Sequence, residues 1–303
     1  MPSPGVSVVI ATRDRLDLLQ CAIGAVVSQD YSGPIEVLVV FDRSTPVPTL
    51  ERDDPHRRVR VLENTRSAGL PGARNSGILA AEHDLVAFCD DDDHWLANKL
   101  RRQVDALESR SAAAAVTGIQ IRFEESVTPR PIDRDSISFD DLIRDRLTEA
   151  HPSTFLIRHE VFEDESELVD EEIPGGYGED YDLLLRLARR APIAVVPEPL
   201  VEVLWHQGSF FTRRFETIVT ALDYLLDKHP EFADDRRGHA RITGQQAFAL
   251  AAIGRRSDSV STALATLRRQ PSEKRALLSL LVNMRVVGPE TVLRLAHRTG
   301  RGI

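Results

Sequence analysis

The segment Leu85–Asp93 reads LVAFCDDDD, an apolar run followed directly by four aspartates. The run Leu85–Cys89 predicts a short strand that is covered on both faces of a sheet. Four adjacent carboxylates repel one another, and that repulsion is tolerable when solvent or a cation neutralises them. Residues two apart in an extended chain point the same way, so we expect Asp90 and Asp92 to face one crevice together.

The segments around this run alternate between strand-like and helix-like patterns. Strands are expected at Val6–Ala11, Ile35–Phe41, Val59–Leu62 and Ala112–Phe123. One helix is expected after Asp14 as N-cap, where apolar residues from Leu16 onward have helical spacing, and further helices are expected within Gly69–Ala81 and at Leu96–Glu108. This alternation with short connections predicts an α/β fold with parallel strands and a doubly wound sheet. Such sheets bind ligands beyond the carboxyl ends of their strands, where the aspartates lie.

The rest of the chain continues the sheet and then becomes helical. Residues 124–138 are polar and contain two prolines, which predicts a loop. A helix is expected at Glu179–Arg190, followed by strands at Ile193–Val196 and Val201–Trp205. From Phe210 onward the apolar residues have helical spacing. We therefore expect a sheet domain at 1–209 and a helical C-terminal region at 210–303.

The composition restricts the classes of partner and the compartment. Acidic residues outnumber basic ones by 47 to 38, and the formal charge of −9 argues against broad nucleic-acid binding. A local basic pocket for one small anion remains compatible with that charge. Cys21 and Cys89 both lie in apolar runs, which fits a reducing compartment better than a disulfide framework.

The sequence contains no sign of a membrane-spanning or secretory segment. No stretch approaches the roughly 18 uninterrupted apolar residues that a membrane span needs. Met1–Gly5 lacks a basic region followed by an apolar stretch, so no signal peptide is recognised. A cytoplasmic location is expected, which leaves room for peripheral attachment to a membrane if the substrate is linked to a lipid.

The four aspartates have two interpretations. Mg²⁺ and Mn²⁺ prefer oxygen ligands, and Mg²⁺ typically binds one or two carboxylates together with substrate phosphates. Alternatively, the aspartates form a solvated acidic turn, with Asp93 in particular capping the helix that follows. Apolar strands that end in four aspartates are uncommon, which favours the metal site.

Five blocks, in order along the chain, resemble family 2 glycosyltransferases of the GT-A fold. Phe88–Trp95, continuing to Leu100, is similar to the Asp-X-Asp region of that family. The other four blocks are Val8–Arg15, Asn64–Gly77, Gly178–Leu183 with Arg186, and His206–Ser209. Each block alone is weak evidence of a resemblance, but five blocks in the order that the family has make the resemblance specific.

The resemblance implies an enzyme with a mixed nucleotide-binding sheet and a helical appendage. It implies a metal-dependent transferase that uses Mn²⁺ or Mg²⁺. This enzyme would move a sugar, with inversion, from a UDP-, GDP- or dTDP-linked donor onto an acceptor hydroxyl. The acceptor, a glycan, a lipid-linked sugar or a small molecule, is not identified by the sequence. In the family pattern Asp90 lies near the ribose, Asp92 binds the metal, and Asp91 occupies the variable middle position.

The resemblance also implies roles for the donor-binding loops. Thr12 and Arg15 would contact the base and ribose, or else form a polar turn. Asp42 would accept a hydrogen bond from a ring N–H of the base. The family usually has Asp-Asp-Gly-Ser or Asp-Asn-X-Ser here, whereas this chain has Phe41-Asp42-Arg43-Ser44-Thr45. Either Asp42 therefore serves, or Phe41 fills the usual aspartate position. Arg74 would donate to the phosphate or ribose oxygens, or would organise the start of a helix.

The last two blocks supply the expected base and a further metal ligand. By resemblance, Asp180 is the carboxylate that removes the proton of the acceptor hydroxyl, with Glu179 as second choice. The alternative is an acidic first helical turn favoured by the helix dipole. His206 would bind the metal or pair with the diphosphate, or would be structural. His151 would border the acceptor site.

Two other functions compete with this interpretation. The first is a non-catalytic sugar-nucleotide-binding or assembly protein, with the helical tail as its interaction surface. The second is a sugar-1-phosphate nucleotidyltransferase, which should have a glycine-rich loop after the first strand. This chain has no glycine in Ala11–Arg15. Arginine pairs in the helical tail would suit an anionic surface or would be solvated.

Overall fold

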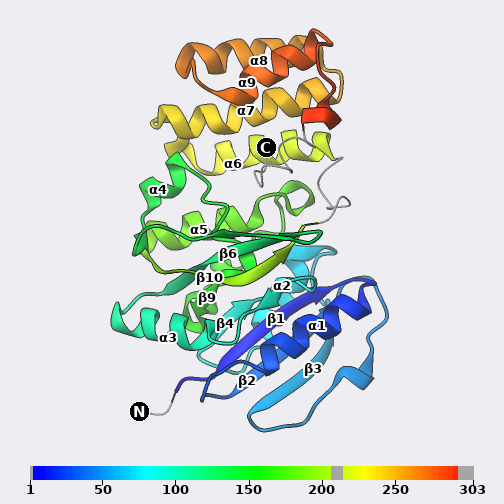
Figure 1. The fold of residues 1–303 in the computed structure, drawn as a ribbon, viewed down its shortest axis with the longest axis vertical. Helices are drawn as coiled ribbons and strands as arrows, with labels where there is room; N and C mark the ends of the chain where they lie inside the picture. Colours follow the sequence, from blue (N-terminus) through cyan, green and yellow to red (C-terminus); the bar gives the residue numbers. More distant parts are fainter. Residues whose placement is uncertain (1–2, 206–213, 293–303) are drawn as a thin grey trace. The chain divides into compact units, whose positions relative to one another are not determined.

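The computed structural model describes residues 3–205 and 214–292, and its strands and helices alternate through the first half of the chain (Figure 1). The strands are β1 Val6–Thr12, β2 Ile35–Phe41, β3 Arg57–Glu63, β4 Leu85–Phe88, β5 His94–Trp95, β6 Ala114–Phe123, β7 Ser126–Arg130, β8 Ser136–Ile137, β9 Leu156–Arg158 and β10 Ile193–Leu204. The helices are α1 Leu16–Val27, α2 Leu70–Leu79, α3 Lys99–Ser109, α4 Phe139–Arg144, α5 Glu179–Arg190, α6 Phe215–Lys228, α7 Arg236–Ala252, α8 Arg256–Arg269 and α9 Lys274–Asn283.

The sheet of the described residues is mixed, in the order β3-β2-β1-β4-β9-β6-β10-β5. Strands β3, β2, β1 and β4 are all parallel, with Val6 paired to both Ile35 and Leu85. Strand β9 is antiparallel to both β4 and β6, and β10 is parallel to β6. The predicted α/β class with a mixed sheet and flanking helices is confirmed. The parallel half brings the carboxyl ends of β1, β2 and β4 to one edge.

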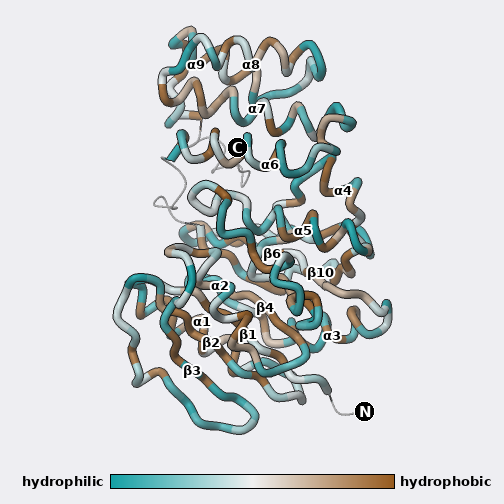
Figure 2. The backbone as a smooth tube through the Cα atoms, turned by 180° about the vertical axis from the view of Figure 1, so that it is seen from behind, coloured by the Kyte–Doolittle hydropathy of each residue, from teal (hydrophilic) through white to brown (hydrophobic). Residues whose placement is uncertain are grey.

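The apolar run of β1 has neighbours on both of its faces. Val8 and Ile10 belong to the same core cluster as Leu19 and Ile23 of α1. Val9 points to the other face, where α2 approaches closely, because a Cβ on Gly77 would lie 2.4 Å from the Val9 side chain. The strands β1, β2 and β4 are accordingly the most uniformly hydrophobic part of the sheet (Figure 2). Continuous rather than alternating apolar runs are typical of strands covered on both faces.

The N-cap predicted for α1 is wrong, and so is the alternative interpretation of Asp93 as a helix cap. The N-cap of α1 is Arg15, without a side-chain capping bond, and Asp14 precedes it with a φ of 56°. Aspartate tolerates this left-handed conformation better than most residues, so Asp14 shapes a turn instead of a cap. Helix α3 begins at Lys99 with Asn98 as N-cap, later than predicted. Asp93 therefore does not cap it.

The loop predicted at 124–138 is also wrong in part. Strand β7 forms a hairpin with β6, and β8 pairs with β10. In β7, Pro129 lies opposite Gln120 of β6. Among the described residues β7 pairs with β6 alone, so the missing N–H of the proline is tolerated at this edge. The two strands predicted between Ile193 and Trp205 are one strand, β10, whose register shifts between Val196 and Val201.

The chain divides into two compact units. The sheet unit comprises Met1–Phe139, Leu147–Glu171 and Glu179–His206, and the helical unit comprises Asp140–Arg146, Glu172–Gly178 and Gln207–Ile303. In the helical unit α7 packs against α6, α8 and α9. Its small cores include Ala247, Ala263 and Ala276 in one cluster and Phe248, Ala251, Val282 and Val292 in another. Among the described residues, no helix has both the length and the hydrophobicity that crossing a membrane requires.

Candidate functional site

Thr12, the last residue of β1, connects the ends of three parallel strands. Its backbone carbonyl accepts a hydrogen bond from the backbone N–H of Asp42, just after β2, at 3.0 Å. Its hydroxyl donates to the carboxylate of Asp91, just after β4, at 2.7 Å. Asp42 and Asp91 therefore lie on either side of one residue. This arrangement follows from parallel strands that end at the same edge of the sheet.

Arg15 neutralises two of the four aspartates. Its guanidinium donates to both oxygens of Asp91, and its Nη1 donates to Asp92 at 2.6 Å. Burial raises the pKa of Asp91 to about 6, although the Thr12 hydroxyl and the Arg15 charge act in the opposite direction. Thr12 and Arg15 thus hold the acidic segment in place through Asp91, whose side chain is buried.

A pocket of about 550 Å³ opens at the ends of β2 and β3. Its wall includes Phe41, Asp42, Arg43, Asn64 and Arg66. Asp42 accepts hydrogen bonds from Asn64 Nδ2 at 2.9 Å, from the backbone N–H of Gly69 at 3.0 Å and from Arg43 Nε at 3.1 Å. Burial alone would raise the pKa of Asp42. These hydrogen bonds lower the pKa by a larger amount, so the net shift is downward. The wall therefore carries an ionised carboxylate.

Glu171 anchors the loop that forms one side of this pocket. Its carboxylate accepts hydrogen bonds from the guanidinium of Arg66, from the backbone of Ser67 at 3.2 Å and from Asn75 Nδ2 at 2.7 Å. Burial opposes ionisation of Glu171, but the three donors outweigh it and lower its pKa to about 2. The loop and helix α2 are thereby joined through one side chain.

Arg74 joins the acidic end of β4 to the start of α5. Its guanidinium is 2% exposed and donates to Glu179 and, at 2.7 Å, to Asp90. It also lies 5.3 Å from the centre of the Phe88 ring. Burial would lower the pKa of Arg74, but the charges of Glu179, Asp90 and Asp180 raise it. In this structure the guanidinium is engaged by protein carboxylates, and it draws two blocks of the sequence together.

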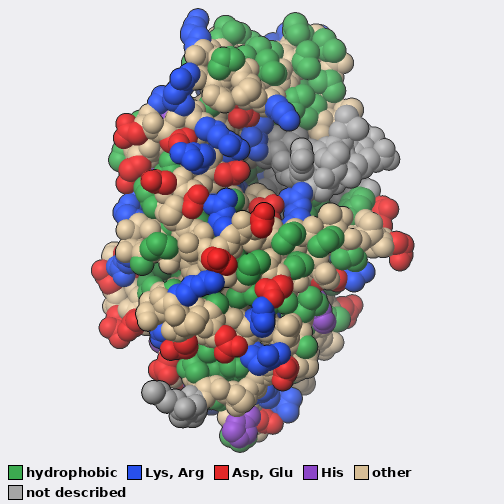
Figure 3. Space-filling view, turned by 60° about the vertical axis from the view of Figure 1, so that its left-hand side comes forward, with side chains coloured by type: hydrophobic (Ala, Val, Ile, Leu, Met, Phe, Trp, Pro, Cys, Tyr) green, Lys and Arg blue, Asp and Glu red, His purple; other side chains and the backbone are tan. Residues whose placement is uncertain are grey.

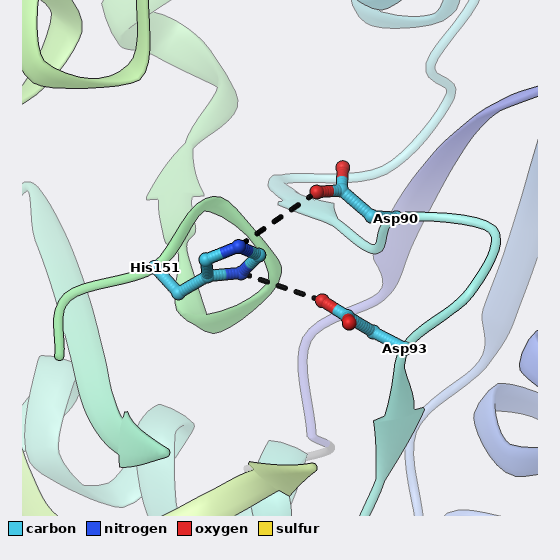
Figure 4. Close-up of side chains that lie close together, drawn as sticks. All are labelled: Asp90, Asp93 and His151. Atoms are coloured by element: carbon cyan, nitrogen blue, oxygen red, sulfur yellow. Dashed lines mark ion pairs between the residues drawn. The ribbon is translucent and has the colours of Figure 1, made fainter. Parts of the chain in front are cut away.

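Asp90, Asp93 and His151 form a cluster whose ligand atoms all lie within 4.8 Å of one another (Figure 4). His151 Nδ1 lies 3.3 Å from Asp93 Oδ2, and His151 Nε2 lies 4.0 Å from Asp90 Oδ2. Ser153 closes the cluster, because its hydroxyl donates to Asp93 and accepts from the backbone N–H of Asp90 at 2.9 Å. The cluster brings the end of β4 together with the turn at Pro152–Thr154.

The charges in this cluster suit a cation. Burial raises the pKa of Asp93 well above its usual range, and the neighbouring carboxylates of Asp90 and Asp92 raise it further, so that a cation bound between them would relieve this repulsion and favour the ionised carboxylate. Burial lowers the pKa of His151 more than the charges of Asp90 and Asp180 raise it, which favours the neutral imidazole. Two carboxylates and a neutral imidazole are ligands that Mn²⁺ accepts. The residues present therefore fit a divalent ion.

The predicted site residues are distributed over two linked networks. Thr12, Arg15, Asp91 and Asp92 form one network, and Arg74, Asp90 and Glu179 form the other. Asp180 is partly buried, and its charge acts on both Arg74 and His151. The predicted ligand His206 lies outside the described residues.

Several residues of the site were not found from the sequence. The sequence interpretation gave Asp93 a capping role and placed His151 beside the acceptor only. The signal for Asp93 was present in the aspartate run, and the signal for His151 was its neighbourhood, His-Pro-Ser-Thr. The roles of Asn64, Ser153 and Glu171 depend on partners far away in the sequence, and no local pattern indicates them.

Comparison with curated proteins gives partial matches. The chain is 34% identical over 119 residues to the succinoglycan biosynthesis protein ExoO of Rhizobium meliloti. The aligned residues cover 39% of this chain and 34% of that protein. It is 28% identical over 142 residues to the Escherichia coli protein UDP-Glc:alpha-D-GlcNAc-diphosphoundecaprenol beta-1,3-glucosyltransferase WfgD, covering 46% of this chain and 55% of WfgD. The matched region thus spans about a third of one relative and just over half of the other.

Solved structures share the fold over nearly the whole chain. The complex of Staphylococcus aureus TarS 1-349 with UDP-GlcNAc superposes with a TM-score of 0.60 at 16% identity, covering 98% of this chain and 92% of that one. The mannosyltransferase PcManGT from Pyrobaculum calidifontis, in complex with GDP-Man and Mn²⁺, has a TM-score of 0.56 at 17% identity, covering 95% and 82%. At these identities the likeness concerns the fold alone.

A family model gives the decisive match. The model described as "Glycosyl transferase family 2" matches residues 7–165, which is just over half of the 303 residues. The matched range includes β1, the pocket at Asp42, the acidic end of β4 and the cluster with His151. The chain belongs to glycosyl transferase family 2.

Proposed function

We propose that this chain is a glycosyltransferase that takes a sugar from a nucleotide-diphosphate donor and transfers it, with inversion, to an acceptor hydroxyl. One observation carries the proposal: Thr12 lies directly between the pocket wall at Asp42 and the acidic segment at Asp91. A base bound in the pocket would therefore place its diphosphate beside the carboxylates and their candidate cation site. The name of the relative WfgD includes UDP-Glc, and the two structural neighbours bind UDP-GlcNAc and GDP-Man, which supports a nucleotide-sugar donor.

The pocket suits a base that presents a ring N–H. Uracil, thymine and guanine all carry such a group, and the ionised carboxylate of Asp42 is an acceptor for it. The hydrogen bonds from Asn64 and Gly69 fix the orientation of that carboxylate. We assign the base contact to Asp42, since Phe41 has no acceptor to offer in its side chain. The donor is accordingly a UDP-, dTDP- or GDP-sugar.

A divalent ion, Mn²⁺ or Mg²⁺, is proposed at the acidic end of β4. Two ligand sets are in question: Asp92 with His206, from the family pattern, and Asp90, Asp93 and His151, from the geometry. When bound, such an ion would neutralise the diphosphate and stabilise the charge on the departing nucleotide. The protein contributes the carboxylates, and Arg15 and Arg74 hold them in position.

We assign the role of base to Asp180. Glu179 is 3% exposed and its carboxylate is engaged by Arg74, which leaves it poorly suited to remove a proton. Asp180 is partly buried and acts electrostatically on His151. In the proposed reaction the acceptor oxygen attacks the anomeric carbon, the bond from that carbon to the diphosphate breaks, and the hydroxyl proton passes to Asp180.

Binding and turnover can be measured separately to test this proposal. Calorimetric titration with UDP-, dTDP- and GDP-glucose, with Mn²⁺ or with a chelator, should give binding to one nucleotide class that the chelator abolishes. Donor turnover in the presence of Mn²⁺ should fall by about 10²- to 10⁴-fold in Asp180→Asn while donor affinity stays unchanged. The exposed Asp105→Asn on α3 is the matched control and should behave as wild type. Absence of binding to any nucleotide would refute the donor proposal, and normal turnover by Asp180→Asn would refute the assigned base.

The ligand sets can be distinguished in the same titration. Loss of Mn²⁺-dependent affinity in Asp93→Asn and His151→Ala, with Asp92→Asn close to wild type, would support the cluster with His151. The reverse pattern would support Asp92. Each variant needs its thermal midpoint measured, because Asp93 is buried and bonded to Ser153.

A further inference from the structure

Large hydrophobic side chains are unusually exposed in one part of the helical unit. Among the described residues, six of the ten large hydrophobic side chains that are most exposed lie between Ile253 and Val286. Figure 3 shows hydrophobic side chains gathered over α8 and α9, with lysines and arginines beside them. Isolated exposed hydrophobics are normal, but a contiguous group marks an interaction surface.

Helix α9 has two apolar faces, of which only one is buried. Ala276, Ser279 and Val282 are buried. Leu277, Leu281 and Met284 are 45%, 37% and 64% exposed. Their spacing of four and three residues places them in one stripe on the outward side of the helix, where a globular protein normally has polar residues. We call this stripe of Leu277, Leu281 and Met284 the α9 face.

The surroundings of the α9 face are strongly basic. Residues 236–292 contain ten arginines and lysines against three acidic residues, a net charge of +7, whereas the whole chain carries −9. Arg268, Lys274 and Arg285 are exposed, and none of them forms an ion pair with any residue in 3–205 or 214–292. Arg268 follows the exposed Leu264 by one helical turn, so basic and apolar groups share one surface on α8 as well.

We propose that the α9 face and its basic surroundings bind the surface of an anionic phospholipid bilayer. A helix with an apolar stripe and flanking cations can bury the stripe at the headgroup boundary while its charges meet anionic lipids. A nucleic acid would satisfy the cations but would leave the leucines in water. A second copy of the chain would cover the leucines but would bring two basic surfaces together. The proposal does not depend on the proposed transferase activity, because a chain without turnover would bind lipid equally well.

Vesicle sedimentation of the full chain tests the proposal. With phosphatidylcholine vesicles containing 30% phosphatidylglycerol in 50 mM salt, the chain should sediment, and pure phosphatidylcholine or 500 mM salt should release most of it. Arg268→Glu with Lys274→Glu should weaken binding by at least 25-fold, since each lost charge accounts for roughly fivefold. Leu277→Glu with Leu281→Glu should abolish binding. Val127→Glu is the matched control, because Val127 is 42% exposed in the sheet unit and should leave binding unchanged.

Hydrogen exchange of the wild-type chain provides a second measurement that needs no variant. Amides of residues 277–286 should exchange more slowly when anionic vesicles are added, while those of β7 should not change. The proposal is overturned if the chain ignores anionic vesicles at low salt, or if the Leu277→Glu/Leu281→Glu variant binds them as wild type does. It is also overturned if light scattering shows a dimer whose formation is blocked by that variant, because a second copy would then occupy the α9 face.

Discussion

Lys99 is a fully buried cation at the first residue of α3. Its ammonium nitrogen lies 3.6 Å from the centre of the Trp95 ring, and no hydrogen-bond partner for it occurs among the described residues. Stacking on the indole favours the charged form, whereas burial favours the neutral amine. Burial is the larger effect and lowers the pKa of Lys99 to about 7. We therefore expect the free energy of unfolding to rise with pH between about 7 and 10.5, because the unfolded chain then binds more protons.

Lys99→Met should remove this pH dependence. Methionine has a similar length and no charge to bury, so the variant should be more stable than wild type at pH 6.5. The difference should shrink by about 2 kcal/mol when both proteins are unfolded with urea at pH 9. The exposed Lys274→Met serves as the control and should follow wild type at both pH values. A constant difference between the two pH values would mean that Lys99 remains protonated in the folded chain.

At the scale of elements, Glu171 joins the pocket loop to α2. Its pKa of about 2 lies below the ordinary value of 4.5, so its ionised form stabilises the folded state. This contribution is complete above pH 4.5 and is lost as the pH falls toward 2. Glu171→Gln should therefore lower the free energy of unfolding by about 2 kcal/mol at pH 7 and by about 1 kcal/mol at pH 3.

Chemical denaturation of Glu171→Gln at the two pH values checks this expectation. The exposed Glu51→Gln is the control and should have little effect at either pH. If Glu171→Gln destabilises the protein equally at pH 7 and pH 3, its hydrogen bonds do not depend on the charge. The variant should also weaken nucleotide binding, because Arg66 lines the pocket and loses the charge of its partner.

At the scale of the whole molecule, the two units are not consecutive in the sequence. The segment Asp140–Arg146 groups with the C-terminal helices. Arg144 pairs with Asp235 at 3.5 Å, and a Cβ on Gly238 would lie 2.1 Å from the carbonyl oxygen of Ile143. A chain that ends at residue 209 would leave this segment without the helices that pack on it. We expect its thermal midpoint to lie at least about 5 °C below that of the full chain.

Differential scanning calorimetry of chain 1–209 and of the full chain tests this point. A chain that ends at residue 292 is the control for shortening as such. Equal midpoints for chain 1–209 and the full chain would instead support the boundary predicted at 209, which is so far a prediction. The net charge also differs along the chain, since residues 236–292 are basic whereas the whole chain is acidic.

The sequence by itself determined the elements that depend on local patterns. Apolar runs predicted β1, β2 and β4 to within one residue, and the stripe of leucines predicted α5 with its observed bounds, Glu179–Arg190. The blocks along the chain predicted the family. Periodicity and motif order succeed here because side-chain direction in strands and helices repeats over a few residues. The assigned roles of base and metal ligands stay predictions.

Only the tertiary structure decided which of these residues meet. Arg74 reaches Glu179 across 105 positions, and Ser153 reaches Asp93 across 60. The antiparallel insertion of β9 and the hairpin of β7 likewise depend on strand partners and not on local composition. Folding gives the four aspartates three environments: Asp91 and Asp92 pair with Arg15, Asp90 pairs with Arg74, and Asp93 faces His151. Four identical neighbours in sequence thus acquire different surroundings, because the electrostatic environment is set by groups that folding brings from elsewhere in the chain.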